Sequence, residues 1–329
     1  MDALKRWGGM LLGSLLVLPA LLPLAAEAQP AYPDKPVRVV VPFSAGGPTD
    51  TFARLVAKKL SDNLGQEFLV DNRPGAGGNL GTQMVAKSRP DGLTLVFVSA
   101  SLAIAPSLYK ALSFDPAKDL VPIALVGVAP MILVTNAEGP STAKVLVEMA
   151  KTSPDRFSYA SAGNGSATHL GGEAFKAGNK IGVVHVPYRG TAPALLDVIA
   201  GRHLFIFDFI GPIKPYLGPG GKLKVLAIAS EKRSDILPDV PTFAEAGLPS
   251  FVSSTWNMFL APAGTPQPVL AKLHDALNRV LKDPEVTAQL RELGIAPVSD
   301  STLDSTQAFL RDETKRWASV VKASGASVD

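Results

Sequence analysis

The sequence of 329 residues predicts an α/β protein of two lobes, each built on a mainly parallel sheet flanked by helices. Short runs rich in Val, Ile and Leu alternate with segments of helical periodicity, which is typical of strand–helix–strand units. This alternation begins at Val37 and begins again at Ile123. Because no long flexible linker separates the two series, we expect short crossovers near Val128 and Ser254 to join the lobes.

The first series supplies the sheet of the first lobe. Its strands are apolar and β-branched, and its helices follow glycine-containing turns. In chain order we expect a strand at 37–41, a helix at 49–64, a strand at 68–71, a helix at 79–87 and a strand at 94–98.

The second series and the C-terminal part complete the chain. We expect an apolar run at 123–136, helices at 143–151, 166–177 and 192–200, and strands at 158–161, 183–186, 204–208 and 223–229. An extended segment at 254–262 and two amphipathic helices at 269–282 and 303–322 are expected to pack back on the first lobe. The lobes then comprise 29–128 with 255–329, and 129–254, with a ligand in the interlobe cleft at the C-terminal ends of the strands.

The N-terminal 28 residues are typical of a cleaved signal peptide. Lys5 and Arg6 precede an apolar run at 10–24, and small residues lead up to Gln29. A retained membrane anchor is the weaker alternative, because the run is short and contains prolines. The chain has no cysteine, so it carries neither disulfides nor a lipid attached through a thiol. In a Gram-negative cell we expect a free periplasmic protein.

Composition excludes a nucleic-acid partner. The chain is 47% hydrophobic and 19% charged with a net charge of +3, which is ordinary for a soluble globular protein. Lys and Arg do not cluster with interleaved aromatic residues, as a nucleic-acid surface requires.

The junction that follows the first strand has the character of an anion site. Its glycines let backbone N–H groups approach a ligand closely, and the first turn of the next helix leaves donors unpaired with a partial positive charge. A carboxylate or a phosphate would suit it. The ligand-binding candidates here are Phe43, Ser44, Ala45, Gly46, Gly47 and Asp50.

Two further segments of the first lobe offer candidates. The loop at 72–79 can present backbone amides, although glycines in a tight strand-to-helix turn need no ligand; Asn79 is its candidate. A partial dinucleotide fingerprint fails there, because Gly81 comes one place too late, and no Walker lysine follows. We interpret 99–105 as a strand-end loop that contacts the far end of the ligand, with Ser99 as its candidate.

The loop at 161–169 is the strongest candidate in the second lobe. Ser166 can cap the next helix while Thr168, His169 and the first-turn amides face the cleft, although capping alone would also explain the serine. His169 and Glu173 make a poor metal site, so we expect no metal. The candidates here are Ser161, Gly163, Ser166, Thr168 and His169.

The turn at 185–191 also joins a strand to a helix. Tyr188 offers a phenolic donor, and Arg189 is either a carboxylate fork or a surface charge. Asp208 ends an apolar strand. Its side chain either caps the following loop or accepts a hydrogen bond from a ligand amine, and the capping role is favoured. The candidates from these segments are Pro187, Tyr188 and Asp208.

These segments together resemble the Bug-type, or tripartite tricarboxylate receptor, family of periplasmic solute-binding proteins, which includes citrate receptors. The resemblance covers essentially the whole mature chain. Its motifs are 32–38, Pro42-Phe43 with 45–47 and Asp50, Asn72 with 75–78, Gly165-Ser166 with His169-Leu170 and Glu173, 185–190, 221–223, Arg233-Ser234, 237–242, Trp256 and 261–266.

The resemblance implies a type II-like periplasmic-binding-protein fold whose lobes close on a small organic anion. The family's ligands are mono-, di- or tricarboxylates, or aromatic or amino acids that bear a carboxylate, and no cofactor is implied. Loops equivalent to 43–50 and 161–169 hold the carboxylate through backbone amides, short side chains and bridging waters in this family.

This chain departs from the family pattern at two places. Because of these departures, we do not assign the ligand of any relative to this chain. The family commonly has Gly-x-Val-Asp where this chain has Gly201-Arg202-His203-Leu204. The loop at 217–221 is about one residue longer than usual. Both changes lie in the second lobe, where they would alter a rim or a hinge.

We therefore expect a receptor, active as a monomer, that catalyses nothing and delivers a carboxylate to the membrane subunits of a tripartite tricarboxylate-type transporter or reports it to a sensor kinase. A secreted hydrolase using Ser166 and His169, or Ser161, His185 and Asp208, is the alternative enzyme. This alternative is disfavoured, because the sequence contains no Gly-x-Ser-x-Gly elbow and no evident oxyanion hole. An anion-binding scaffold without a transport role is the third possibility.

Overall fold

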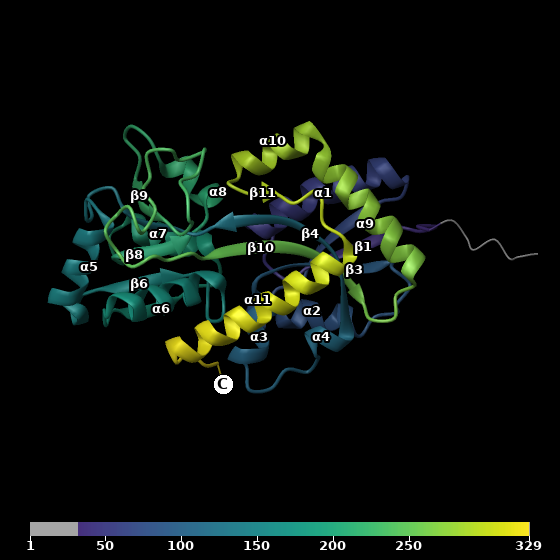
Figure 1. Cartoon of the computed structure of the whole chain (residues 1–329), viewed down its shortest axis with the longest axis horizontal. Coiled ribbons are helices and arrows are strands. Elements are labelled where there is room, and N and C mark those ends of the chain that lie inside the picture. Colours follow the sequence, from purple (N-terminus) through teal and green to yellow (C-terminus); the bar gives the residue numbers. More distant parts are fainter. Residues whose placement is uncertain (1–31, 329) are drawn as a thin grey trace, which may run out of the picture. The chain divides into compact units, whose positions relative to one another are not determined.

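The computed structural model describes residues 32–328, so the expected signal peptide, 1–28, lies outside the described residues. Two sheets organise this part of the chain (Figure 1). We call the six-stranded sheet with its helices lobe 1 and the five-stranded sheet with its helices lobe 2. The residue boundaries of the lobes, 29–128 with 255–329 and 129–254, stay a prediction.

The sheet of lobe 1 is mixed. β1 pairs in parallel with β2 and β3, as expected from the first series, whereas β10 runs antiparallel between β3 and β4. The strand order is β11-β4-β10-β3-β1-β2. The strands are β1 (Val37–Val41), β2 (Phe68–Asn72), β3 (Thr94–Ser99), β4 (Leu120–Pro130), β10 (Ser254–Pro262) and β11 (Ala296–Pro297).

The sheet of lobe 2 repeats this plan. β6 pairs in parallel with β7 and β8, and β5 runs antiparallel to β8 and β9. The order is β7-β6-β8-β5-β9. The strands are β5 (Ile132–Asn136), β6 (Ser158–Ser161), β7 (Val184–Pro187), β8 (Phe205–Asp208) and β9 (Leu223–Ile228).

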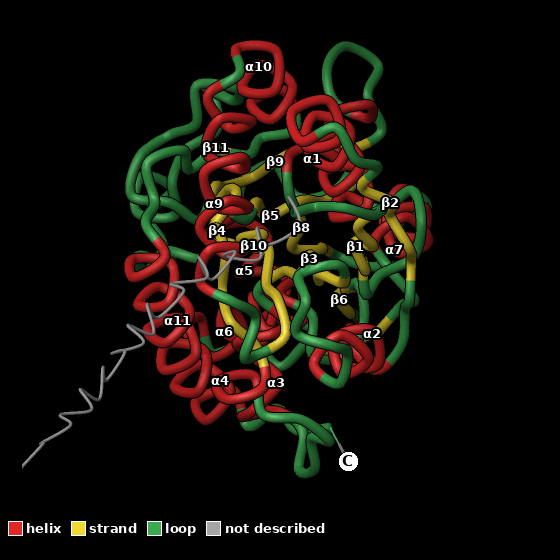
Figure 2. Tube along the Cα trace, turned by 90° about the vertical axis from the view of Figure 1, so that its right-hand side faces the viewer, coloured by secondary structure: helices red, strands yellow, loops and turns green. Residues whose placement is uncertain are grey.

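Helices lie on both sides of the strands (Figure 2). Lobe 1 contains α1 (Pro48–Leu64), η1 (Ala76–Gly78), α2 (Asn79–Ala86), α3 (Ser101–Leu108), α4 (Pro116–Asp119), α9 (Gln267–Lys282), α10 (Pro284–Glu292) and α11 (Leu303–Ser324). Lobe 2 contains α5 (Ala143–Thr152), η2 (Pro154–Arg156), α6 (Ala167–Asn179), α7 (Thr191–Ile199), α8 (Ile210–Ile213) and η3 (Lys214–Tyr216).

Two expectations from the sequence are wrong. The segment 99–105 is not a loop, because α3 begins at Ser101 directly after β3. This helix is buried around most of its surface and contains Pro106, so it has no amphipathic pattern to read. The C-terminal part also contains a third helix, α10, which Asp283 caps and Pro284 starts.

The two crossovers between the sheets meet at one point. Met131 lies between β4 and β5; its N–H donates to the Ser253 carbonyl at 2.9 Å, and its own carbonyl accepts from Ala229 at 2.8 Å. The Ser253 N–H in turn donates to the Ala229 carbonyl at 3.0 Å. These bonds tie the two crossovers, at Met131 and Ser253, to each other and to Ala229 at the end of β9.

The hydrophobic core is continuous across the crossovers. One cluster is confined to lobe 1 and another to lobe 2, while a third contains Trp256 and Met258 of β10 together with Leu133 and Phe207 of lobe 2. Helix α11 packs on α3 of lobe 1 and on α6 of lobe 2. The lobes therefore share apolar surface at the side where α11 lies (Figure 1).

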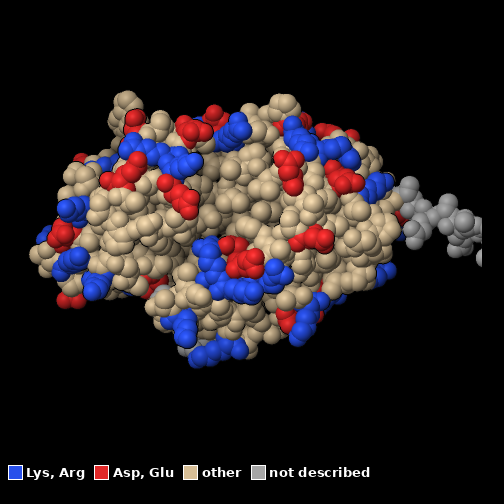
Figure 3. Space-filling view, viewed as in Figure 1, with Lys and Arg blue, Asp and Glu red and all other residues tan. Residues whose placement is uncertain are grey.

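Basic and acidic side chains are interspersed on the face shown in Figure 3. Between residues 32 and 328, no helix has the length and apolar character needed to cross a membrane.

Candidate functional site

The junction between β1 and α1 is organised from inside by Asp50. This side chain is only 3% exposed. Its Oδ2 accepts from the Gly46 N–H at 2.8 Å and from Arg54 Nε at 3.0 Å, and its Oδ1 accepts from Asn72 Nδ2 at 2.9 Å. Asn72 Nδ2 also donates to the Phe43 carbonyl at 3.0 Å. The turn is thus fixed to the end of β2.

The Asp50 carboxyl is ionised in this setting. Its burial alone would raise its pKa, but the hydrogen bonds from Arg54, the Gly46 N–H and Asn72 outweigh the burial and lower the pKa below its usual value. Asp50 therefore shapes the loop, while the neighbouring residues Ser44, Ala45 and Gly46 are exposed.

The second glycine-rich loop of lobe 1 carries an unpaired donor. Ala76, Gly77 and Gly78 have positive φ angles of 48°, 65° and 99°, which bend the chain sharply into α2. A Cβ at Gly78 would lie 3.3 Å from Phe43 Cζ and 3.5 Å from Ser101 Oγ, so these residues converge. The Nδ2 atom of Asn79, the first residue of α2, is buried and has no hydrogen-bond partner. A ligand oxygen would supply the acceptor that this donor lacks.

The loop between β6 and α6 is held by its own short side chains. Ser166 caps α6 by accepting from the His169 N–H at 3.2 Å, and its hydroxyl donates to the Gly163 carbonyl at 2.7 Å. Thr168 Oγ1 accepts from the Ala162 N–H at 2.9 Å, and His169 Nδ1 accepts from the Gly165 N–H at 3.2 Å. The capping role of Ser166 expected from the sequence is present.

Two neutral imidazoles lie below this loop. His185 stacks on Tyr159 with ring centroids 4.8 Å apart, and His185 Nε2 lies 2.7 Å from Ser161 Oγ. Burial lowers the pKa of His169, and burial together with repulsion from a protonated His169 lowers the pKa of His185 to about 3. The loop thus offers an anion neutral hydrogen-bond donors rather than a buried cation.

Glycine-rich loops of the two lobes meet. A Cβ at Gly165 of lobe 2 would lie 2.5 Å from Leu108 Cδ2 at the end of α3. A Cβ at Gly77 of lobe 1 would lie 2.6 Å from Tyr109 Oη and 3.7 Å from the carbonyl oxygen of Asn164. Gly165 thus lies against Leu108 of lobe 1, and Gly77 lies near Asn164 of lobe 2, which brings the region of Asn79 next to the β6–α6 loop.

Tyr188 is engaged in a polar chain within lobe 2. Its hydroxyl hydrogen-bonds to Asp197 Oδ2 and lies 2.7 Å from His203 Nε2, while His203 Nδ1 lies 2.7 Å from Ser158 Oγ. Arg202 pairs with Asp197 at 2.6 Å. His203, which belongs to the departure at 201–204, is thus part of this polar chain of hydrogen bonds. The sequence showed only that a histidine at this position is unusual for the family.

The remaining candidates differ in exposure. Pro187 is exposed, and Ser99 Oγ lies 3.3 Å from Ser101 Oγ. Asp208 is fully buried, and its Oδ1 accepts from the Phe209 N–H at 2.8 Å, whereas its Oδ2 has no hydrogen-bond partner. That these candidates contact a ligand stays a prediction.

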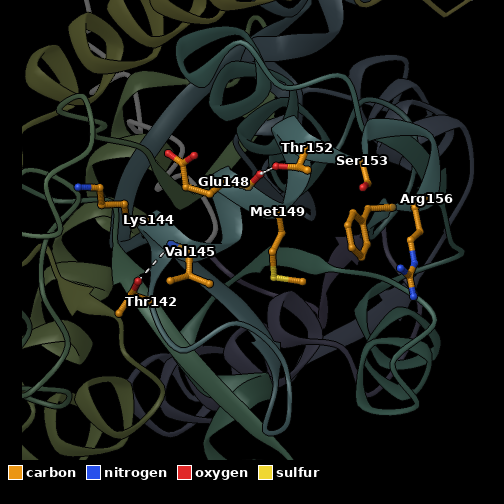
Figure 4. A pocket seen from close by; sticks show the side chains of 9 residues that line it. Thr142, Lys144, Val145, Glu148, Met149, Thr152, Ser153 and Arg156 are labelled. Carbon is orange, nitrogen blue, oxygen red and sulfur yellow. Dashed lines mark hydrogen bonds between the residues drawn. The ribbon is translucent and has the colours of Figure 1, made fainter.

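A surface hollow of about 540 Å³ lies elsewhere, along α5 and η2 (Figure 4). Its lining includes Val145, Met149 and Phe157, with Lys144 and Arg156 at its sides. None of the candidate residues lines it. Among residues 32–328, no group of three His, Asp or Glu side chains is arranged to hold a metal ion.

Comparison with known proteins relates the chain to a family of solute receptors. A sequence model of one protein family, described as the tripartite tricarboxylate transporter family receptor, matches residues 52–326. Protein BugT of Bordetella pertussis is 37% identical over 309 residues, covering 93% of each chain.

Two solved structures are also similar. Periplasmic binding protein BugD is 36% identical with a TM-score of 0.84, covering 90% of this chain and 99% of its own. R. palustris Rpa4515, solved with adipate, is 34% identical with a TM-score of 0.85 and the same coverage of each chain, 90% and 99%. The two-lobed α/β fold predicted from the sequence is thereby confirmed.

Proposed function

Because the chain belongs to the tripartite tricarboxylate transporter receptor family, we propose that it captures a small organic carboxylate between its two lobes. The observation that carries this proposal is the meeting of the two glycine-rich loops, with the unpaired Asn79 Nδ2 beside their contact. Di- and tricarboxylates, aromatic acids and amino acids are the candidate ligands. Adipate in a relative of 34% identity supports the class but not the individual compound.

The physical basis of capture is a set of neutral donors. Helices α1, α2 and α6 begin at the candidate loops, and each helix N-terminus carries unpaired N–H groups and a partial positive charge. A carboxylate that is removed from water needs several hydrogen bonds to offset its desolvation. Closure of the lobes supplies donors from both sides and expels water.

The receptor would act in the periplasm, after removal of residues 1–28, and would present its ligand to a transporter or a sensor. A relative described as a periplasmic binding protein supports this location. We expect the receptor to be a monomer without a cofactor.

The hydrolase alternative has one specific observation, the 2.7 Å contact between Ser161 Oγ and His185 Nε2. Ser161 is fully buried, however, and among the described residues no carboxylate hydrogen-bonds to His185. A nucleophile–base pair without an orienting acid, closed off from substrate, fits catalysis poorly. Turnover of ester substrates that is lost in Ser161→Ala would overturn the receptor proposal.

The decisive experiment is thermal unfolding of the mature protein, refolded to remove bound ligand, against a panel of aliphatic, aromatic and amino carboxylates. A ligand at 100 times its dissociation constant stabilises by about 2.7 kcal/mol, which raises Tm by several degrees. The best compound is then titrated against Asn79→Ala, which we expect to bind about tenfold more weakly. Asn63→Ala, on an exposed position of α1, is the matched control. If the two variants bind the ligand with equal affinity, Asn79 does not belong to the binding site.

A further inference from the structure

The carboxyl group of Asp208 is buried near the candidate loops with one of its two oxygens unpaired. It is fully buried at the end of β8. Oδ1 accepts from the Phe209 N–H, and the Thr191 side chain also donates to the carboxyl group. Oδ2 is buried without any partner. A buried oxygen of this kind is costly whether it is charged or carries a proton that it cannot donate.

Asp208 lies at the edge of lobe 2 that faces lobe 1. β8 runs parallel to β6 with Ile206 opposite Ala160, so the two strands end together, Asp208 beside the loop that begins at Ala162. The next residue, Phe209, packs against the core of lobe 1. After it, Ile210 contacts lobe 1 closely, because a Cβ at Gly294 would lie 2.6 Å from Ile210 Cβ.

No cation compensates Asp208 from the elements packed against β8. These elements are β5, β6, α6 and α7, and β5 contains no ionisable residue. The ionisable side chains on the other three are Tyr159, His169, Glu173, Lys176 and Asp197. Glu173 pairs with Lys176 and accepts from Tyr159, Asp197 pairs with Arg202, and His169 accepts from Gly165.

We propose that Asp208 binds the ligand as a neutral acid, with its Oδ2–H group donating a hydrogen bond to a carboxylate oxygen of the ligand. This rests on the proposed function. Oδ1 is already an acceptor, so the proton resides on Oδ2, the atom that lacks a partner. Burial raises the pKa of Asp208 to about 7, although the hydrogen bonds from Phe209 and Thr191 lower it, which agrees with a protonated group.

The proposal fixes the sign of the pH dependence of binding. If the protonated carboxyl binds the anion, affinity is constant below pH of about 7 and falls up to tenfold per pH unit above it. If an ionised Asp208 instead accepted from a ligand ammonium group, affinity would rise with pH over the same range.

The experiment measures the affinity for adipate, or for the panel compound with the largest thermal shift, from pH 5.5 to 8.5. Asp208→Asn keeps a donor and removes the titration, so we expect binding within about twofold of wild type at low pH and no decline above pH 7. Asp208→Leu lacks a donor and should bind at least about tenfold more weakly. Asp155→Asn, an exposed aspartate of lobe 2, should follow the wild-type pH profile.

Loss of binding in Asp208→Asn, or an affinity of the wild type that rises with pH, would overturn the proposal. A second measurement needs no ligand: infrared difference spectra between wild type and Asp208→Asn at pH 6 should contain the C=O stretch of a protonated carboxyl group. Its absence would also overturn the proposal. A panel in which no carboxylate binds would refute the proposed function and, with it, the ligand contact, even if the infrared band showed a protonated Asp208.

Discussion

The imidazole rings of His169 and His185 stack with centroids 4.1 Å apart and an interplanar angle of 17°. His169 lies in the first turn of α6, and His185 lies in β7. Through Gly165 and Ser161 respectively, the two rings support opposite ends of the same loop. The stack therefore links the shape of the candidate site to the protonation of two histidines.

We expect stability to fall as the pH drops below about 6.5. The pKa values of both rings are lowered in the folded protein, that of His185 to about 3, so the unfolded chain binds protons first and gains stability from them. Each histidine contributes at most about 1.4 kcal/mol per pH unit, less where solvent screens it. Tm between pH 7.5 and 5 should decline less steeply in His185→Gln than in wild type. Parallel declines would show that His185 does not carry the effect.

Gly165→Ala should loosen the contact between the lobes. The residue has a φ of +78°, and its new Cβ would lie 2.5 Å from Leu108 Cδ2. The left-handed backbone alone costs about 1–2 kcal/mol. Gly220→Ala is the matched control, because its φ is +72° but nothing lies within 4 Å. Calorimetric titration should show weaker ligand binding in Gly165→Ala than in Gly220→Ala, and equal binding would contradict a role for this contact.

Asp50→Ala should disturb the β1–α1 turn. It leaves the Gly46 N–H and one donor of Asn72 without their acceptor, and we expect a loss of about 2 kcal/mol in the free energy of unfolding and weaker binding. Asp62→Ala, exposed on the same helix, should change neither quantity measurably. Urea unfolding and ligand titration check both; unchanged binding in a folded Asp50→Ala protein would remove this turn from the site.

Tyr188 and His203 should be energetically coupled. A double-mutant cycle with Tyr188→Phe and His203→Val is expected to give a coupling of about 1 kcal/mol in unfolding, because each substitution removes the same 2.7 Å hydrogen bond. A coupling near zero would mean that the His203 departure has no structural consequence at this turn.

The alternation of strands and helices could be predicted from the sequence because most elements carry a local pattern. β1 is a β-branched apolar run, and α11 has an amphipathic period and a Thr302 cap. α3 could not be predicted in this way, since a helix buried around most of its surface loses its polar face. The antiparallel direction of β10 could not be predicted either, because it depends on the side from which the chain re-enters the sheet of lobe 1.

The sequence by itself determined the lobed α/β architecture, the glycine-rich loops and the capping of α6 by Ser166, since these follow from backbone conformation and nearby residues. Only the tertiary structure decided that Gly77 and Gly165 from different lobes meet at Tyr109, that Tyr188 turns to His203, and that Asp208 is buried with one oxygen unpaired. Such properties arise from contacts between distant segments. Burial and the loss of solvent then set the charge of each group, which no local pattern specifies.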